Sequence, residues 1–248
     1  MKTEKPRLDQ RLVELGLAPT RARAQALIMA GQVMVGGKPA DKAGTRVAPD
    51  AVVTIKDDEA TRYASRGAGK LAPALDAFNV DPTEKICLDV GASTGGFTDV
   101  LLERGAARVF AVDVGKGLLY WRLRQDSRVT VMEEVNARFL KPADLPEPID
   151  LAVIDVSFIS LTLILPAVAP LLGPAGAGEV VAMVKPQFEV GKEKVGKGVV
   201  RDPAAIASAV DKVAECAAGL GLREVGRAAS EVKGPKGNQE VFLHLRLK

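Results

Sequence analysis

The sequence has few of the side chains from which metal centres and disulfide frameworks are built. It contains one histidine and two cysteines in 248 residues, so we expect no zinc site and no other metal. Cys87 and Cys216 fall in a predicted strand and a predicted helix. That placement favours small core residues over a disulfide, and it predicts a reducing, cytoplasmic compartment.

Long apolar runs are missing as well. No run approaches the roughly 20 residues needed to span a bilayer, and Met1–Pro6 has none of the apolar character of a signal peptide. We therefore expect no membrane partner. Hydrophobic residues still make up 47% of the chain, enough for a substantial core. The net charge is only +3, so nucleic-acid binding depends on how the basic residues cluster.

The first 58 residues have the pattern of a small α+β domain. Leu8 and Leu12 recur at helical spacing, Thr20 stands where it would cap a second helix, and Gly36-Gly37 marks a hairpin turn. A further strand is expected over residues 51–55. A polar segment without periodicity follows, so we place a linker at residues 59–66 and a second domain at 67–248.

This first segment resembles the S4 RNA-binding domain. The matching stretches are Arg7-Leu8-Asp9, Thr20–Ala24, Ala30–Val33 and Val35–Lys38. The resemblance implies that arginines of this domain contact RNA phosphates, which the planar guanidinium fork can grip through two hydrogen bonds. Solvated surface charges are the alternative interpretation. No aromatic residue lies among these charges, so we expect contact with the RNA backbone and shape and no base stacking here.

The segment Leu88–Phe97 combines an apolar run, an acid, a glycine-rich turn and the start of an amphipathic stretch. Such a strand, loop and helix can hold a polar cofactor against free backbone N–H groups. The glycines are spaced G-x-x-x-G-G, unlike the dinucleotide-binding fingerprint, and no lysine follows as in a phosphate-binding loop. The spacing resembles the first motif of S-adenosylmethionine (SAM)-dependent methyltransferases.

Strand and helix patterns alternate from Lys85 onward, which is typical of a parallel sheet covered on both faces. The last two apolar stretches, 224–231 and 240–247, are too close for a helical crossover and should pair antiparallel. We expect an α/β, Rossmann-like, seven-stranded mixed sheet, resembling the SAM-dependent methyltransferase fold. The expected strands cover 86–90, 108–114, 129–133, 151–156 and 180–184, and the expected helices lie near 96–104, 117–125, 160–172 and 203–220.

Charged residues follow several predicted strands where each one ends. Asp113, Asp155 and Lys185 should therefore meet at one edge of the sheet, and Glu240 joins them if its strand is antiparallel. Charges at the ends of buried strands pair or take part in function, and a structural ion pair between Asp155 and Lys185 is the alternative. The candidate cofactor-binding residues are Asp89, Gly91, Ser93, Gly95, Gly96, Phe97, Asp113, Glu134 and Asn136.

The stretch from Ser65 to Leu71 resembles the opening of the catalytic domain in FtsJ-type ribose 2′-O-methyltransferases. With it, Lys70, Asp155, Lys185 and Glu240 match the catalytic Lys-Asp-Lys-Glu tetrad of that family. The resemblance implies that Lys185 removes the proton of a ribose hydroxyl, or stays charged and orients it. A flexible basic loop, 191–200, follows Lys185. The candidate RNA-binding residues are Arg7, Arg11, Arg21, Arg23, Arg66, Lys192, Lys194 and Lys197.

The whole chain, S4-like segment and FtsJ-like segment together, resembles the TlyA (hemolysin A) family of ribosomal RNA 2′-O-methyltransferases. The resemblance implies SAM as cofactor, a cytidine ribose in ribosomal RNA of assembled subunits as substrate, and a monomer or weak oligomer. Tyr63 matches the family's interdomain aromatic only loosely. Two alternatives stay open: a non-catalytic RNA-binding protein that keeps an inactive methyltransferase fold, and a membrane-active hemolysin.

Overall fold

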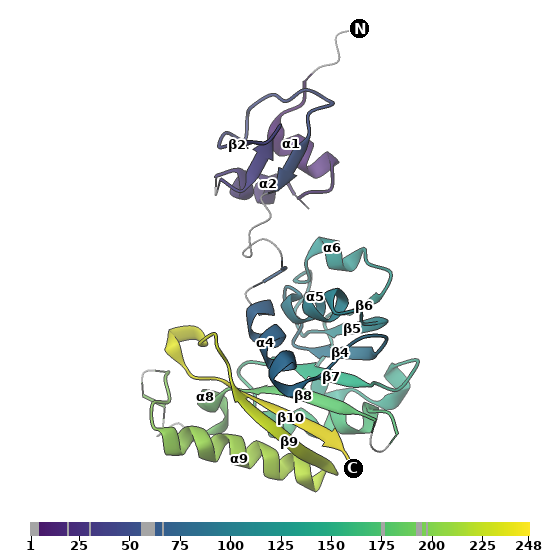
Figure 1. The fold of residues 1–248 in the computed structure, drawn as a ribbon, viewed down its shortest axis with the longest axis vertical. Helices are drawn as coiled ribbons and strands as arrows, with labels where there is room; N and C mark the ends of the chain where they lie inside the picture. The colour runs from purple at the N-terminus through teal and green to yellow at the C-terminus, as the bar shows by residue number, and fades with distance from the viewer. Residues whose placement is uncertain are drawn as a thin grey trace. The chain divides into compact units, whose positions relative to one another are not determined.

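The computed structural model describes residues 5–18, 20–29, 31–55, 63–65, 67–174, 177–191, 195–196 and 198–248. The chain divides into two compact units, a small unit, Met1–Arg62, and a large unit, Tyr63–Lys248 (Figure 1). The division falls inside the segment expected to be a linker. Tyr63 and Ala64 belong to the large unit, where the Tyr63 hydroxyl donates to Glu103 and the Ala64 N–H donates to Asp99 at 2.8 Å.

The small unit has two helices against an antiparallel sheet in the order β2-β1-β3. Thr20 accepts a hydrogen bond from the Arg23 N–H at 3.2 Å, which confirms the expected helix cap. Gly36 and Gly37 both have positive φ, as the tight turn between β1 and β2 requires. The elements are α1 (Leu8–Glu14), α2 (Arg21–Met29), β1 (Val33–Val35), β2 (Lys38–Ala40) and β3 (Val53–Ile55).

The large unit is built on a seven-stranded sheet in the order β6-β5-β4-β7-β8-β10-β9. The first five strands in this order are parallel, and β10 runs antiparallel to both β8 and β9. The expected α/β class and the antiparallel terminal pair are confirmed. The strands are β4 (Ile86–Val90), β5 (Arg108–Val112), β6 (Val129–Met132), β7 (Leu151–Ile154), β8 (Glu179–Val184), β9 (Leu222–Ala229) and β10 (Val241–Leu247).

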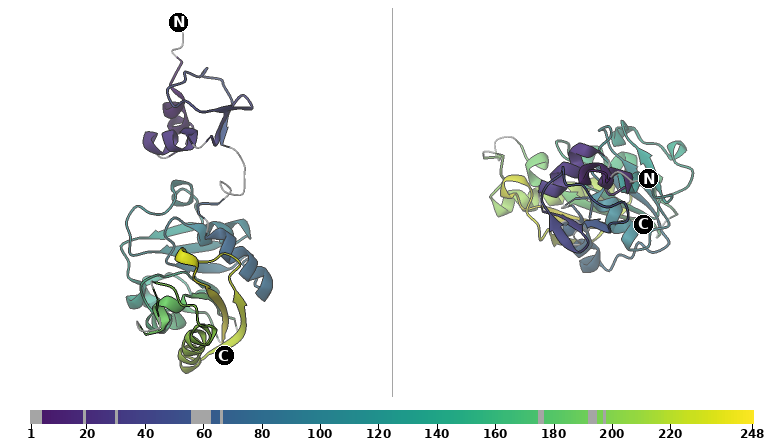
Figure 2. Two further views of the ribbon diagram at one scale, coloured as in Figure 1. Left: turned by 90° about the vertical axis from the view of Figure 1, so that its left-hand side faces the viewer. Right: turned by 90° about the horizontal axis from the view of Figure 1, so that it is seen from above.

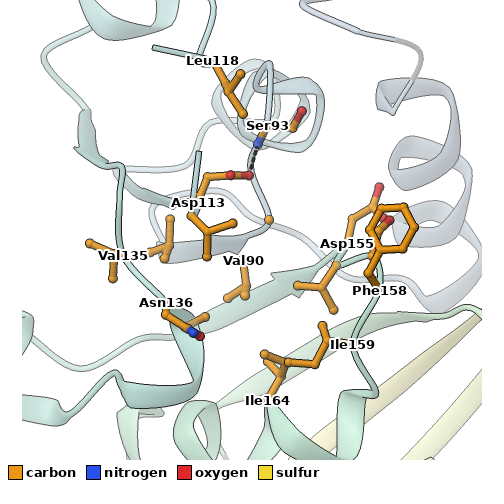
Figure 3. A pocket seen from close by; sticks show the side chains of 16 residues that line it. Val90, Ser93, Asp113, Leu118, Val135, Asn136, Asp155, Phe158, Ile159 and Ile164 are labelled. Atoms are coloured by element: carbon orange, nitrogen blue, oxygen red, sulfur yellow. Dashed lines mark hydrogen bonds between the residues drawn. The ribbon is translucent and has the colours of Figure 1, made fainter. Parts of the chain in front are cut away.

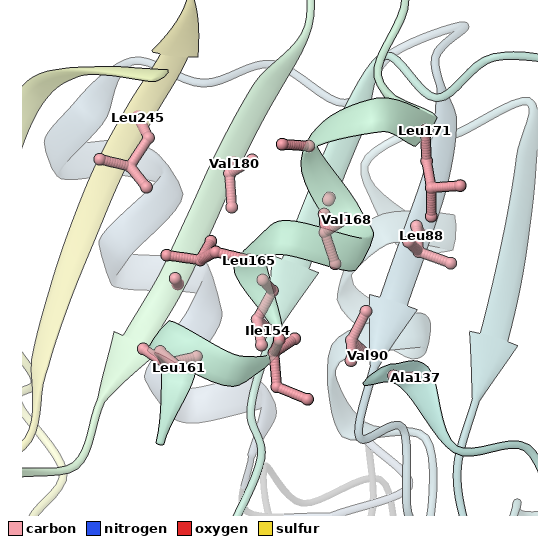
Figure 4. Close-up of a cluster of buried hydrophobic side chains, with 14 of the residues drawn as sticks. Leu88, Val90, Ala137, Ile154, Leu161, Leu165, Val168, Leu171, Val180 and Leu245 are labelled. Atoms are coloured by element: carbon pink, nitrogen blue, oxygen red, sulfur yellow. The ribbon is translucent and has the colours of Figure 1, made fainter. Parts of the chain in front are cut away.

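Helices cover both faces of this sheet (Figures 1 and 2). On one face, α4, α5 and α6 pack against strand residues such as Cys87 and Val109. On the other, α7 and α9 pack against Leu88, Val90 and Ile154, and Figure 4 shows part of that cluster. Neighbouring strand residues belong to opposite cores because side chains alternate along a strand. The helices are α4 (Ala68–Phe78), α5 (Gly96–Glu103), α6 (Trp121–Arg124), α7 (Leu165–Val168), α8 (Pro186–Glu189) and α9 (Pro203–Gly219).

Two helices differ from their expected extent. The helix expected over 160–172 is three short pieces, because Pro166 and Pro170 each stand near the start of a new piece and cannot donate to the turn before. The helix expected over 117–125 is only α6. Short 3-10 turns complete the fold: η1 (Ala137–Phe139), η2 (Pro142–Asp144), η3 (Leu161–Leu163), η4 (Ala169–Leu171) and η6 (Pro235–Gly237).

Both cysteines are free thiols. Among the described helices, none combines the length and the apolar character that crossing a membrane requires.

A buried carboxylate holds the starting end of β8. Glu179 is 6% exposed, and it contacts Lys85 at 2.9 Å, His244 at 3.3 Å and the guanidinium of Arg246. The hydrogen bonds from His244, Lys85 and Arg246 hold the pKa of Glu179 well below its ordinary range. This cluster joins the segment before β4 to two neighbouring strands, so it fixes three parts of the chain at one end of the sheet.

We expect Glu179→Gln to lower the free energy of unfolding near neutral pH by about 2 kcal/mol, because the surrounding cations lose a buried partner. Since the pKa of Glu179 is lowered by folding, its contribution exists above the ordinary value of 4.5 and fades as the pH falls below it. Urea unfolding at a series of pH values measures this. The difference between the two proteins should shrink on acidification, and a constant difference would contradict the assignment. Glu147→Gln, which breaks a more exposed pair with Arg108, is the control and should cost less than about 0.5 kcal/mol.

Candidate active site

The carboxyl ends of the parallel strands bring distant residues to one edge of the sheet. Asp155 directly follows β7, and Lys185 directly follows β8. β10 pairs with β8 in the antiparallel register Val241↔Val184. Glu240, one residue before β10, therefore lies at the same edge as Lys185.

Four charged side chains at this edge form two ion pairs. Lys185 Nζ lies 2.6 Å from Asp155 and donates to the Ser157 hydroxyl at 2.8 Å. Lys70 Nζ, from the first turn of α4, lies 2.6 Å from Glu240. Glu240 is fully buried and Lys185 is 8% exposed. Charges this poorly hydrated are tolerated because each has a partner of opposite sign.

The glycine-rich loop connects β4 to α5. Gly91 has φ +85°, and a Cβ on it would collide with the carbonyl oxygen of Asp155, so the loop can approach the end of β7 only with glycine there. Gly95 has φ +97° and stands just before α5. Gly96 begins α5 under the Ser65 hydroxyl, which leaves no room for a Cβ.

Asp89 lies behind this loop. Its side chain is fully buried, and one oxygen accepts hydrogen bonds from the Thr98 N–H at 2.8 Å and the Thr98 hydroxyl at 2.7 Å. Burial raises the pKa of Asp89 to about 7. The carboxyl group thus ties β4 to the first turns of α5 and supports the loop from below.

A cleft of about 420 Å³ opens at the ends of β4, β5 and β7 (Figure 3). Asp113 lines it, and the Asp113 carboxylate accepts hydrogen bonds from the N–H groups of Ser93 at 2.8 Å and Gly115 at 2.7 Å. Asn136 also lines this cleft, and its side chain caps η1 by accepting a hydrogen bond from the Arg138 N–H at 3.1 Å. The remaining lining is largely apolar and includes Val90, Val114, Leu118, Val135, Ile159 and Ile164.

Neither Glu133 nor the expected Glu134 lines this cleft, but Glu133 holds the loop that carries the lining residue Leu118. Glu134 is exposed and pairs with Lys116 at 2.9 Å. Glu133 accepts from the N–H groups of Gly117 and Leu118 and pairs with Arg124. Burial alone would raise the pKa of Glu133, but hydrogen bonds from Gly117, Leu119 and Arg124 lower it to about 2. The Glu133 carboxylate thus holds the loop that carries Leu118 through hydrogen bonds to its backbone.

A second, more polar cleft of about 510 Å³ adjoins the first and shares Gly91, Ser93 and Asp155 with it. Lys70, Gly96 and Phe97 line it, so the structure brings these predicted residues to one place. Lys185 and Glu240 are absent from the lining and are the buried partners of Asp155 and Lys70. Two lysines that the sequence reasoning missed, Lys233 and Lys236, also line this cleft.

Phe158 is a third candidate that the sequence reasoning missed. It is 90% exposed at the rim of the first cleft, and its φ of +65° is unusual for a bulky residue. Its ring packs against Phe188 with centroids 5.1 Å apart. The signal available in the sequence was an aromatic residue three positions after Asp155, at the end of a buried strand.

The basic residues expected to contact RNA differ in their surroundings. Arg7 and Arg21 both pair with the buried Asp9. Arg11 pairs with Glu14 at 3.2 Å and donates to the Pro49 carbonyl at 2.7 Å. Arg23 is exposed. The other four candidates lie outside the described residues: Arg66, Lys192, Lys194 and Lys197.

In the part of the chain that the structure describes, no group of three or more His, Cys, Asp or Glu side chains is placed to hold a metal ion.

Comparison with known proteins identifies the family of both units. Residues 63–247 match the FtsJ-like methyltransferase family, and residues 6–53 match the S4 domain. The 16S/23S rRNA (cytidine-2′-O)-methyltransferase TlyA of Mycobacterium tuberculosis is 50% identical over 97% of this chain and 89% of its own. Hemolysin A of Brachyspira hyodysenteriae is 38% identical over 96% of this chain and 98% of its own.

A solved structure from Streptococcus thermophilus, described as a hemolysin, has 43% identity and a TM-score of 0.74. It covers 99% of this chain and 89% of its own. The chain therefore belongs to the FtsJ-like methyltransferase family, and within it to the TlyA proteins that carry an S4 domain at the N-terminus.

Proposed function

We propose that this protein transfers the methyl group of SAM to the 2′-hydroxyl of a cytidine ribose in ribosomal RNA. The observation that carries the proposal is the pair of adjoining clefts that share Gly91, Ser93 and Asp155, with the Lys185–Asp155 and Lys70–Glu240 pairs beside them. The relative from M. tuberculosis, whose name states this reaction, supports the choice of substrate. Ribosomal subunits as the substrate would place the protein in the cytoplasm.

The first cleft, at about 420 Å³, has the size of a small-ligand site, and its lining suits SAM. Asp113 carries carboxylate oxygens that can accept hydrogen bonds from ribose hydroxyls, as acids at the end of the second strand do in nucleotide-binding folds. The apolar rim formed by Val114, Leu118 and Val135 suits a flat purine ring. When bound, SAM supplies a methyl group on a positively charged sulfur, which an oxygen nucleophile can displace.

The second cleft would receive the ribose beside Asp155, the lining residue whose buried partner is Lys185. As the new oxygen–carbon bond forms, the hydroxyl must lose its proton, and Lys185 Nζ is the group we assign to that proton. Lys185 accepts it where Nζ enters the step as a neutral amine. Where Nζ stays an ammonium paired with Asp155, it stabilises the negative oxygen and the proton leaves to solvent. Asp155 and Ser157 fix the position of Nζ in both cases. The Lys70–Glu240 pair fixes α4 against the start of β10. The side chains that surround the ribose hydroxyl are therefore in place before the RNA binds.

Phe158 gives the proposed substrate a place for its base. An enzyme that modifies a nucleotide within folded RNA commonly extrudes it from the helix, and an aromatic ring can stack on the exposed base. Phe158 is exposed and backed by Phe188, at the boundary of the cleft that contains Asp155. We assign it as the stacking surface for the target base.

The main test is methyl transfer from labelled SAM to purified ribosomal subunits, followed by mapping of the modified sugar. We expect Lys185→Met to reduce transfer by at least about a hundredfold, while the Kd for SAM changes little because Lys185 does not line the first cleft. Lys141→Met, at an exposed site, is the matched control. Full transfer by Lys185→Met would refute the assignment, and no transfer by the unmodified protein would favour an RNA-binding protein with an inactive methyltransferase fold.

Asp113 should control SAM affinity. Asp113→Asn replaces one oxygen with an NH2 group, which faces backbone donors and cannot accept from a ribose hydroxyl. We expect the Kd for SAM, measured by calorimetry, to rise about tenfold or more. Asp144→Asn, at an exposed cap of η2, should leave it unchanged. Equal affinity in both variants would remove Asp113 from the proposed cofactor site.

Phe158→Ala should weaken the RNA side of the reaction. Loss of one base–aromatic stack is expected to lower kcat/KM for ribosomal subunits about tenfold or more, with the Kd for SAM nearly constant. Phe158→Trp should keep most activity because it preserves a stacking face. Phe139→Ala, which removes another exposed ring, is the control. If Phe158→Ala and Phe139→Ala behave alike, the stacking role is excluded.

A further inference from the structure

The small unit contains a buried carboxylate whose partners are exposed arginines. Asp9, in the first turn of α1, is fully buried. Arg7 reaches it with two hydrogen bonds, Nε to Oδ1 at 3.0 Å and Nη2 to Oδ2 at 3.1 Å. Arg21, from the start of α2, donates through Nη2 to Oδ2 at 3.1 Å, and Gln25 donates to the same oxygen at 2.9 Å. One carboxylate thus connects the two helices.

The outer faces of both guanidinium groups remain accessible. The Arg7 side chain is 40% exposed and that of Arg21 is 53% exposed. The Nη1 group of Arg7 and the Nε and Nη1 groups of Arg21 make none of the hydrogen bonds to Asp9. Gly44 lies beside the Arg7 guanidinium, where a Cβ would be in ordinary contact with Nη1 at 3.4 Å. Two positive charges share one negative partner, so the trio presents a net positive face with free N–H donors.

This arrangement differs from an ordinary surface ion pair. In an exposed pair both side chains move, and the carboxylate competes with any incoming anion for the same donors. Here Asp9 is buried and binds only Nε and Nη2 of Arg7 and Nη2 of Arg21, so the other guanidinium N–H groups are not used by it. The Arg7 guanidinium holds the pKa of Asp9 well below its usual range, so the carboxylate stays charged across the working pH.

We propose that Asp9 is a positioning residue that fixes Arg7 and Arg21 as a preformed pair for phosphate groups of the ribosomal RNA backbone. The inference rests on the proposed function, because it takes ribosomal RNA as the partner. A free arginine loses rotamer freedom when it binds phosphate, and that loss weakens binding. Arginines already held by Asp9 have lost this freedom on folding, so their donors meet phosphate oxygens without a further ordering cost.

The inference predicts an effect opposite in sign to simple electrostatics. Asp9→Asn removes one negative charge from a surface that binds a polyanion, and charge alone would make binding tighter and more dependent on salt. If Asp9 positions the arginines, the same substitution frees both guanidinium groups and weakens binding. We expect the Kd for ribosomal subunits to rise about tenfold, with the Kd for SAM unchanged.

The experiment measures binding of the full chain to ribosomal subunits, dissociated from bacterial ribosomes, across a salt series. Circular dichroism and thermal unfolding check that each variant is folded. Glu147→Gln is the matched control, because it also removes a carboxylate paired with an arginine, Arg108 at 2.7 Å, but in the large unit. Weaker binding by Asp9→Asn alone supports the inference. Equal or tighter binding overturns it.

Further variants separate this inference from the proposed RNA contact and from misfolding. If Arg7→Ala and Arg21→Ala both bind subunits normally, the RNA contact itself is wrong. If they bind weakly while Asp9→Asn binds normally, the contact stands and the positioning role is overturned. Should Asp9→Asn fail to fold, Arg21→Lys decides, since it keeps the charge and loses the planar fork. We expect Arg21→Lys to bind about fivefold more weakly, and normal binding would overturn the inference.

Discussion

The antiparallel entry of β10 beside β8 is the constraint on which the active-site edge depends. In a wholly parallel sheet all strands start at one edge and end at the other. A residue just before one strand and a residue just after the neighbouring strand would then lie at opposite edges. Because β10 runs the other way, Glu240 lies beside Lys185. Its register is set by packing, since Leu243 and Leu245 belong to one core and Phe242 to the other. If β10 shifted by one residue against β8, each of its side chains would point to the opposite face of the sheet. Phe242, Leu243 and Leu245 would then pack into the wrong cores.

β8 carries a buried charge at each end, and the two ends do different work. Glu179 is held at the starting end by cations from the sheet and from the segment before β4, so it contributes to stability. Lys185 at the other end is held by Asp155, beside an open cleft. Removing water from an ion pair costs free energy that the pairing alone often fails to recover. The packed sheet between the two ends therefore keeps the charges of the active-site edge in place.

Much of this arrangement could be predicted from the sequence. The features that could not be predicted depend on local geometry. Alternating periods and residues at strand ends predicted the sheet and the meeting of Asp155, Lys185 and Glu240, because strand direction decides which residues share an edge. The sequence did not indicate that Glu133 would bind the loop before α6 while Glu134 would stay exposed. Which of two adjacent acids turns inward depends on the exact end of β6 and on the φ of +58° at Glu134. Nor did it indicate that Asp9 is buried between two arginines, since that depends on how α1 packs on α2.

Several residues in the segments around the clefts have strained backbone angles. Ser93, Phe158 and Lys236 have positive φ without being glycine and line the clefts, Ser93 and Phe158 from loops and Lys236 from η6. Asn79, Glu84 and Glu134 share this conformation outside the lining. Such conformations cost about 1–3 kcal/mol each and persist only where the surrounding structure determines them. Ser93 donates its N–H to Asp113 at 2.8 Å, and Phe158 lies three residues after Asp155, so two of the strained residues stand beside the acids of the clefts. The strain is thus local to the loops, while the core of the sheet, which is continuous on both faces, supplies the stability that tolerates it.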